Sequence, residues 1–131
     1  MIYLDSAALV KLVHDETESE ALRSWLDERI DTPWVSSVLV EIEAFRALAR
    51  HGSAVAKDVP RVLDMVELVE LDPRIRILAQ TAKPMTVRSL DAVHLGTALS
   101  LTRLTAFVTY DKRLAEAAQL AGLPVFSPGA A

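Results

Sequence analysis

The sequence predicts an α/β protein of three layers, in which a central parallel sheet of about four to five strands carries helices on both faces. Short apolar runs alternate with stretches of helical periodicity along the whole chain, which is typical of consecutive strand–helix units. Proline and glycine residues separate these segments at regular intervals. The chain has 131 residues, of which 51% are hydrophobic, and this length predicts one domain over residues 1–131.

In the first half of the chain, a short apolar run at residues 2–4 predicts the first strand, and helical periodicity follows at residues 7–13 and 18–29. The Thr32-Pro33 step precedes a second strand at residues 34–36, which leads into a helix from residue 37 to about residue 50. Residues 55–66 also have a helical pattern. Pro60 must begin or kink that segment, because its ring prevents it from continuing a preceding helical turn.

The second half of the chain repeats the alternation. We expect strands at residues 68–71, 106–109 and 124–126, and helices at residues 74–82, 89–103 and 111–121. The tail, residues 127–131, is expected to be frayed.

The composition excludes several kinds of protein and site. The chain has no cysteine, so it can hold neither a thiolate metal site nor a disulfide framework. No apolar run is long enough to span a membrane and no signal-peptide pattern opens the sequence, which predicts a cytoplasmic protein. The net charge of −4 argues against a protein that coats nucleic acid through charge alone.

Two aspartates follow predicted strands. Asp5 comes directly after the strand at residues 2–4, and Asp111 comes two residues after the strand at residues 106–109. Ligands of open α/β sheets bind beyond the carboxyl ends of the strands, so both residues are expected at the functional edge. Aspartate is also favoured at helix starts, which leaves open that each residue only caps the next helix.

Two glutamates of the helix predicted at residues 37–50 differ in their expected surroundings. The apolar stripe of that helix consists of Val38, Ile42, Phe45 and Ala49. A helical wheel puts Glu41 inside the apolar arc and Glu43 on the polar side, near Arg46. A carboxylate on a buried face is costly unless it is paired, protonated or bound to a metal. The wheel therefore predicts that Glu41 binds a cation and that Glu43 is a solvated partner of Arg46.

The helix predicted at residues 89–103 is apolar nearly all round, so we expect it to be buried. Asp91 lies near its first turn, where it would also stabilise the helix dipole, although that explanation suits an exposed helix start better than a buried one. His94 has no second histidine four residues away, and we interpret it as a core residue with satisfied hydrogen bonds.

Convergence of these acids would explain their placement. Four carboxylates brought together repel one another, and the repulsion raises some of their pKa values unless a divalent cation lies between them. A carboxylate set without histidine or cysteine selects hard cations such as Mg²⁺ or Mn²⁺. Such an ion can activate water and neutralise charge on a phosphate. The candidate ligands are Asp5, Glu41, Asp91 and Asp111.

Four blocks of the sequence resemble the PIN-domain ribonucleases and, within them, the VapC-type toxins of type II toxin–antitoxin pairs. The blocks are IYLDSAALV at residues 2–10, VSSVLVE at residues 35–41, SLDAVHL at residues 89–95 and FVTYDKRL at residues 107–114. They are spread over nearly the whole chain and occur in the order that the family shows.

The resemblance implies a PIN fold, an endoribonuclease that depends on Mg²⁺ or Mn²⁺, an RNA substrate, a cognate VapB-type antitoxin and a homodimer. It carries the family's four acidic positions onto the candidate acids given above. The family's hydroxyl before the fourth acid corresponds to Thr109. The Ser or Asn that usually follows the first Asp by two residues is replaced by Ala7, with a hydroxyl at Ser6 instead, which puts in doubt a hydrogen bond near Asp5.

Three basic residues flank the acids and are candidates for RNA contact, or are simply solvated helix residues: Arg88, Lys112 and Arg113. Other kinds of protein fit less well. A phospho-receiver domain needs an acidic pair where Asp5 stands alone, and a phosphatase of the haloacid-dehalogenase type needs a second aspartate where Ala7 stands. A catalytically idle PIN-like module that only binds a partner is the remaining alternative.

Overall fold

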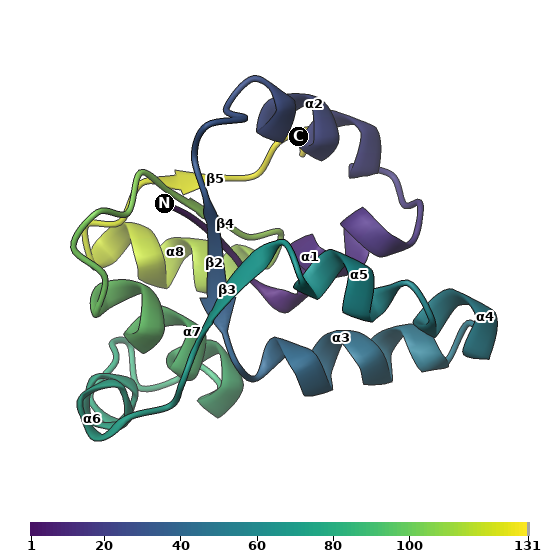
Figure 1. The fold of residues 1–131 in the computed structure, drawn as a ribbon. Helices are drawn as coiled ribbons and strands as arrows, with labels where there is room; N and C mark the ends of the chain where they lie inside the picture. The colour runs from purple at the N-terminus through teal and green to yellow at the C-terminus, as the bar shows by residue number, and fades with distance from the viewer. Residues whose placement is uncertain (131) are drawn as a thin grey trace.

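A parallel sheet forms the centre of the molecule, and helices cover both of its faces (Figure 1). The computed structural model describes residues 1–130. The strands are β1 (Ile2–Leu4), β2 (Trp34–Ser37), β3 (Val66–Val69), β4 (Ala106–Val108) and β5 (Val125–Phe126). Their order in the sheet is β3-β2-β1-β4-β5, and every neighbouring pair is parallel. The predicted α/β fold class is therefore confirmed.

The helices follow the strands in the order that the sequence predicts. They are α1 (Ser6–Val13), α2 (Ser19–Asp27), α3 (Val40–Ala49), α4 (Ser53–Ala56), α5 (Val59–Leu63), α6 (Pro73–Gln80), α7 (Ser89–Leu99) and α8 (Lys112–Leu120). None of the helices within residues 1–130 combines the length and the apolar character needed to cross a membrane.

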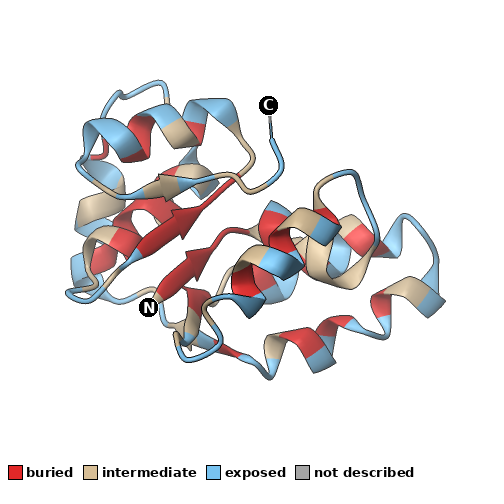
Figure 2. Cartoon of the chain, turned by 90° about the horizontal axis from the view of Figure 1, so that it is seen from above, coloured by how far each residue is buried: buried red, intermediate tan, exposed pale blue. Residues whose placement is uncertain are grey.

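Two hydrophobic cores lie on opposite faces of the sheet, because side chains of a strand alternate between its faces. Ile2 and Leu4 of β1 pack with α1, α2 and α5 on one face, whereas Tyr3 packs with α7 and α8 on the other. Strands β1, β2 and β4 are almost completely buried, whereas β3 and β5 at the sheet edges are partly exposed (Figure 2). The parallel pairing of β1 with β4 places Leu4 beside Val108, so the segments that follow these two strands leave the sheet side by side.

Helix α7 is buried, as its apolar periphery predicts. It packs closely on α6, and Gly96 is the point of closest approach. A Cβ atom at Gly96 would lie 2.9 Å from the backbone nitrogen of Ala79 and 3.1 Å from the carbonyl oxygen of Ile75. Glycine is therefore required there by the approach of two backbones.

Some predicted boundaries differ from the observed ones. The helical segment predicted at residues 55–66 is two short helices, α4 and α5, and Pro60 lies in the first turn of α5, where its missing N–H is tolerated. Val66 begins β3 rather than ending a helix, so that strand lies at residues 66–69 instead of 68–71. The helix predicted from residue 37 begins at Val40, because β2 continues to Ser37.

The predicted face of α3 is wrong. Val40, Ala44 and Leu48 are the buried residues of this helix, whereas Ile42 is 61% exposed and Phe45 is 50% exposed. The helix has apolar residues on two sides, and the helical wheel predicted burial of the side with the larger side chains. The buried side carries the small Ala44, which allows α3 to pack closely on α1 and α5.

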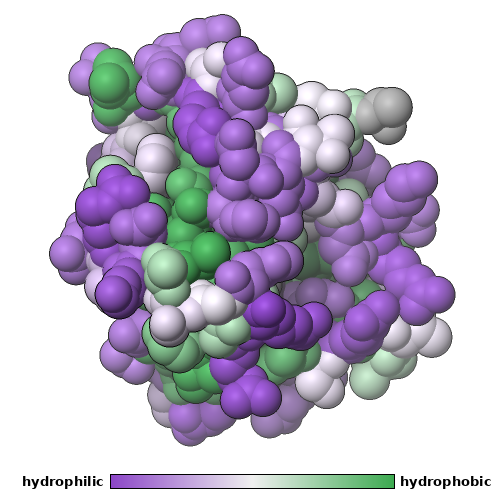
Figure 3. Space-filling view, turned by 90° about the vertical axis from the view of Figure 1, so that its right-hand side faces the viewer, coloured by the Kyte–Doolittle hydropathy of each residue, from purple (hydrophilic) through white to green (hydrophobic). Residues whose placement is uncertain are grey.

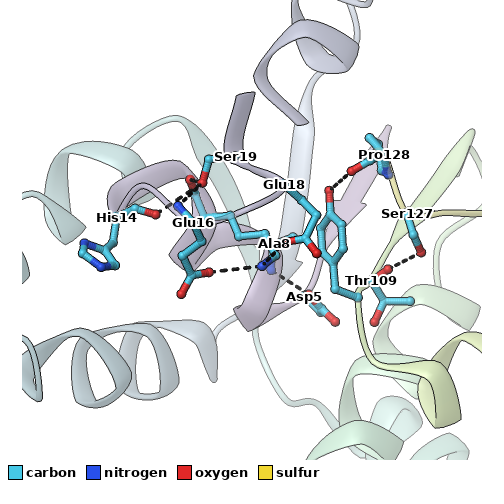
Figure 4. A network of polar contacts seen from close by, with 11 residues as sticks. Asp5, Ala8, His14, Glu16, Glu18, Ser19, Thr109, Ser127 and Pro128 are labelled. Carbon is cyan, nitrogen blue, oxygen red and sulfur yellow. Dashed lines mark hydrogen bonds and ion pairs between the residues drawn. The ribbon is translucent and has the colours of Figure 1, made fainter. Parts of the chain in front are cut away.

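The chain end also differs from the expected frayed tail. Ser127 donates a hydrogen bond from its hydroxyl to the carbonyl oxygen of Thr109, and the Tyr110 hydroxyl donates to the carbonyl oxygen of Pro128 at 2.8 Å (Figure 4). The Tyr110 ring lies under the ammonium group of Lys11, which is paired with Glu18 at 2.9 Å. Composition alone does not reveal these contacts. Ala131 lies outside the described residues.

Candidate metal centre

Two acids lie where β1 and β4 end, and each of them caps a helix. Asp5 accepts the backbone N–H of Ala8 at 2.9 Å and begins α1. Asp111 accepts the N–H groups of Arg113 and Leu114 at 2.8 and 3.0 Å and begins α8. In both residues these capping bonds use one oxygen, Oδ1, and do not involve Oδ2. The capping function therefore does not exclude a role as a ligand.

Asp5 is buried, and its surroundings favour the protonated acid. Burial raises the pKa of Asp5, and the nearby His94 ring, together with hydrogen bonds to the carboxyl from Thr109 and Ala8, offsets only part of that rise. The Asp5 carboxyl points from the start of α1 toward Thr109, which is fully buried at the end of β4 (Figure 4). The Thr109 hydroxyl also accepts the backbone N–H of Asp111 at 3.2 Å, so it links the segments that carry both acids.

Asp91 joins this pair from the first turn of α7. Burial raises the pKa of Asp91, and the negative charges of Asp111 and Glu43 raise it further, while His94 and Arg88 act in the opposite direction. The charge of Asp91 in turn raises the pKa of Asp5. These mutual effects place the carboxylates of Asp5, Asp91 and Asp111 in one neighbourhood at the carboxyl edge of the sheet.

The fourth carboxylate of this neighbourhood belongs to Glu43. Its Oε1 atom lies 2.8 Å from Nε2 of His94, and its side chain is 19% exposed. The other ring nitrogen of His94 lies 2.6 Å from the hydroxyl of Tyr3. Both ring nitrogens are therefore satisfied, which confirms the interpretation of His94 as a buried core residue. Burial raises the pKa of Tyr3 far above the ordinary value for tyrosine.

The expected positions of Glu41 and Glu43 are thus exchanged. Glu41 is exposed and lies beside a surface hollow lined by Phe45, Pro60 and Leu63, and it is not among the groups that influence the pKa values of Asp5 and Asp91. Glu43 is two residues further on and turns toward α7. The sequence does contain a signal for this arrangement, because Val40, Ala44 and Leu48 recur every four residues. The helical wheel favoured the other side because its apolar side chains are larger.

The donor chemistry of this neighbourhood fits a hard divalent cation. Carboxylate oxygens are the preferred ligands of Mg²⁺ and Mn²⁺, and a cation would relieve the repulsion that raises the pKa of Asp91. Among residues 1–130, no three acidic or histidine side chains are already arranged to hold a metal ion. The carboxylates are therefore neighbours that a cation would draw together, rather than a preformed cage.

The remaining candidates from the sequence lie around this centre. Arg88 is exposed at the start of α7 and close enough to Asp91 to lower its pKa. Lys112 and Arg113 are exposed in the first turn of α8, next to Asp111. Ser6 is half-buried at the first residue of α1. The contribution of these residues to RNA binding or to metal binding stays a prediction.

Comparison with known proteins gives the family of the chain. Residues 2–120 match the PIN domain family. The chain is 46% identical to Ribonuclease VapC35 of Mycobacterium tuberculosis over 134 aligned positions, which cover 100% of this chain and 99% of that protein. It is 43% identical to Ribonuclease VapC46 of the same organism, with 97% of each chain covered.

A solved structure with a similar fold is the crystal structure of Mycobacterium tuberculosis VapC20, described as a toxin that cleaves the sarcin–ricin loop. The two structures superpose with a TM-score of 0.76 over 98% of this chain and 100% of that one. Their sequence identity is 15%, so this likeness concerns the fold alone. The family match and the full-length relatives show that the chain belongs to the PIN-domain family and, within it, to the VapC-type ribonucleases.

Proposed function

We propose that this VapC-type protein is a toxin endoribonuclease that hydrolyses RNA with a divalent cation held by Asp5, Glu43, Asp91 and Asp111. The proposal is supported by the electrostatic coupling near the carboxyl edge of the sheet, where burial raises the pKa values of Asp5 and Asp91, Asp91 acts on Asp5, and Asp111 and Glu43 act on Asp91. An acidic cluster of this kind only destabilises a protein unless a cation compensates its charge. Full-length relatives named as ribonucleases support RNA as the substrate.

The protein residues have separate tasks in this proposal. When bound, the cation supplies Lewis-acid chemistry, by lowering the pKa of water and by neutralising charge on the phosphate. Asp5 and Asp111 are fixed by their capping bonds, so each presents one free oxygen from a rigid position. Asp91 is held by the buried helix α7, and Glu43 is held by His94. Thr109 orients Asp5 and the start of the Asp111 segment.

The cation is Mg²⁺ or Mn²⁺ in this proposal, since a site without nitrogen or sulfur ligands offers no advantage to softer metals. RNA reaches the centre across the basic residues that flank it, and we assign phosphate contacts to Arg88, Lys112 and Arg113. These three side chains are exposed and lie at the starts of α7 and α8, where backbone N–H groups also favour anions.

The family also supports two protein partners, a cognate VapB-type antitoxin and a second copy of the chain. Hydrophobic side chains such as Ile42 and Phe45 of α3 and Met65 after α5 are exposed. On the face at the α4 end of the molecule, hydrophobic groups are visible between hydrophilic ones (Figure 3). Light scattering of the purified chain measures whether it is a dimer.

The test of the proposal is a pair of measurements on one set of preparations. Wild-type protein should melt at a higher temperature in millimolar Mn²⁺ or Mg²⁺ than in EDTA, because an ion bound only by the folded state adds about 2.7 kcal/mol at a hundredfold excess over its Kd. Asp91→Asn should lose both this increase and RNA cleavage. Metal-dependent cleavage at the wild-type rate by Asp91→Asn would contradict the proposal. If the wild type binds the cation but cleaves no RNA, the result would instead favour an idle binding module.

A further inference from the structure

We infer that His94, held in place by the Tyr3 hydroxyl, is a positioning residue that fixes the Glu43 carboxylate for metal binding. The observation is an unbroken hydrogen-bonded row from the central strand β1 through α7 to α3. The inference rests on the proposed function, because it assigns a task to a residue that supports one of the proposed ligands. It goes beyond the set of four acids, since neither His94 nor Tyr3 is a ligand.

The row begins at a side chain that cannot move. Tyr3 is fully buried in the middle strand of the sheet, and its ring stacks on Phe107 of β4 with ring centres 5.1 Å apart and planes at 9°. His94 meets the Tyr3 ring at 81°, in an edge arrangement, and is itself only 1% exposed. The position of the Tyr3 hydroxyl is therefore set by the sheet, and the 2.6 Å contact transmits that position to the His94 ring.

The direction of the hydrogen bonds suits a metal ligand at the end of the row. An ionised carboxylate can only accept, so the hydrogen between Nε2 of His94 and Oε1 of Glu43 must be carried by Nε2. A tyrosine hydroxyl has an ordinary pKa of about 10 and is protonated at neutral pH, so it can donate to Nδ1 of a neutral imidazole. When Tyr3 donates to Nδ1, the single ring hydrogen of a neutral His94 is on Nε2, the nitrogen that faces Glu43.

Glu43 needs such support more than the other acids do. Asp5 and Asp111 have short side chains fixed by capping bonds, whereas glutamate has one more rotatable bond and loses more rotamer entropy when it is ordered. Glu43 also comes from the separate helix α3, which packs on α1 and α5. The bond to His94 orders the Glu43 side chain in advance and uses only Oε1, so Oε2 stays free for a cation.

The experiment compares Mn²⁺ affinity, measured by calorimetry on the full chain, with RNA cleavage at saturating Mn²⁺. His94→Leu removes both bonds and should weaken Mn²⁺ binding by roughly 10- to 100-fold, the usual effect of removing a group that orients a metal ligand. His94→Gln retains one acceptor toward Tyr3 and one N–H donor toward Glu43, and should restore most of the affinity. Leu95→Ala is the matched control, because it opens a cavity in the same buried helix without touching Glu43.

A spectroscopic readout tests the same inference without metal. Nitrogen-detected NMR of the histidine rings should show Nε2 of His94 carrying a hydrogen in the metal-free wild type. A His94 ring whose Nε2 carries no hydrogen would overturn the inference, since Glu43 would then receive no donor. In Tyr3→Phe, both neutral tautomers of His94 should be populated, with the hydrogen on either ring nitrogen. This variant should lower the Mn²⁺ affinity by less than His94→Leu does. This variant and His94→Gln keep the test decisive if His94→Leu fails to fold.

Glu43→Gln separates failure of this inference from failure of the proposed function. Unchanged Mn²⁺ binding and cleavage in Glu43→Gln would remove Glu43 from the metal centre, and the proposed set of four acids would be wrong. A weakened Glu43→Gln together with wild-type affinity in His94→Leu would overturn only the positioning role. If His94 acts through Glu43, adding His94→Leu to Glu43→Gln should cause little further decrease in affinity.

Discussion

Single residues in this protein carry more than one task. Asp5 and Asp111 cap helices and at the same time present a free oxygen to the candidate metal centre. His94 is a satisfied core residue and also the partner of a proposed ligand. A residue that caps a helix or makes a buried hydrogen bond can therefore also have a functional role. Its surroundings in the folded chain determine whether it does.

Glu43 and Glu41 provide a matched test at this scale, because they are chemically identical and two residues apart. Glu43→Gln keeps the shape of the side chain but removes a ligand charge, so cleavage should fall by at least tenfold. Glu41→Gln should leave cleavage near wild type, since Glu41 is exposed beside Phe45 and Pro60. Both variants are assayed on one RNA at fixed Mn²⁺. An equal decrease in the two variants, or a larger decrease in Glu41→Gln, would show that α3 faces the other way.

Asp91 provides a pH-dependent prediction. Its folded-state pKa is raised above the ordinary value for aspartate, so the folded protein binds this proton more tightly than the unfolded chain does. The stability that Asp91 contributes is fully present below the unfolded pKa and is lost as the pH rises through the folded pKa.

In EDTA at neutral pH, Asp91→Asn should therefore melt at a higher temperature than wild type. This gain should shrink as the pH falls toward the ordinary aspartate pKa of about 3.9, because the folded wild type then binds a proton at Asp91 and loses the destabilising charge. Thermal melts of both proteins across that range measure the difference. A gain that grows on acidification would contradict the assigned direction of the shift.

At the scale of elements, the pairing of α6 with α7 positions the acidic end of α7. The two helices approach so closely at Gly96 that their backbones are in contact range. This approach holds α7 against the sheet and so determines where Asp91 in its first turn and His94 in its second turn lie. The position of Asp91 in the proposed metal centre therefore depends on packing about one and a half turns further along the helix.

Gly96→Ala tests this packing. Alanine favours an isolated helix over glycine by about 1 kcal/mol, but its Cβ would lie 2.9 Å from the Ala79 nitrogen, which is backbone and cannot rotate away. We expect a net decrease of about 1–3 kcal/mol in unfolding free energy from overpacking. Urea denaturation of the two proteins measures it. A more stable Gly96→Ala variant would mean that α6 and α7 are further apart than described.

The whole molecule has its acids and its flanking bases at the same edge. The net charge of the chain is −4, so attraction of RNA depends on where basic residues lie rather than on the total. Lys112 and Arg113 stand beside Asp111, and Arg88 stands near Asp91. In the proposed mechanism, phosphates contact these side chains while the acids hold a cation.

Replacing Lys112 and Arg113 by alanine together should weaken RNA binding and flatten its dependence on salt. The slope of log affinity against log salt should change by about 0.7 for each phosphate that no longer meets a basic side chain, the value for single strands. The control is the double variant Lys57→Ala and Arg61→Ala, which removes the same charge from the segment of α4 and α5. Binding is measured by fluorescence anisotropy over a range of salt concentrations, with Asp91→Asn as background so that the RNA stays intact. Equal effects of the two double variants would assign the change to net charge alone.

The sequence by itself determined the fold class, the order of strands and helices, and three of the four acids of the proposed metal centre. Alternating apolar runs and helical periods are local properties, and an acid directly after a strand reaches the carboxyl edge of a parallel sheet in any arrangement of the remaining chain. The burial of α7 was likewise readable, because that helix is apolar on every side.

The tertiary structure alone decided which glutamate of α3 faces the site. Helix α3 has apolar residues on two sides, and periodicity does not say which of them is covered; close packing on α1 and α5 selects the side with the small Ala44 over the side with Ile42 and Phe45. The partners of His94, on a strand 91 residues away and a helix 51 residues away, are likewise contacts that only the folded chain creates. Local patterns set what each segment becomes, whereas the choice between two plausible faces depends on how closely its neighbours can approach.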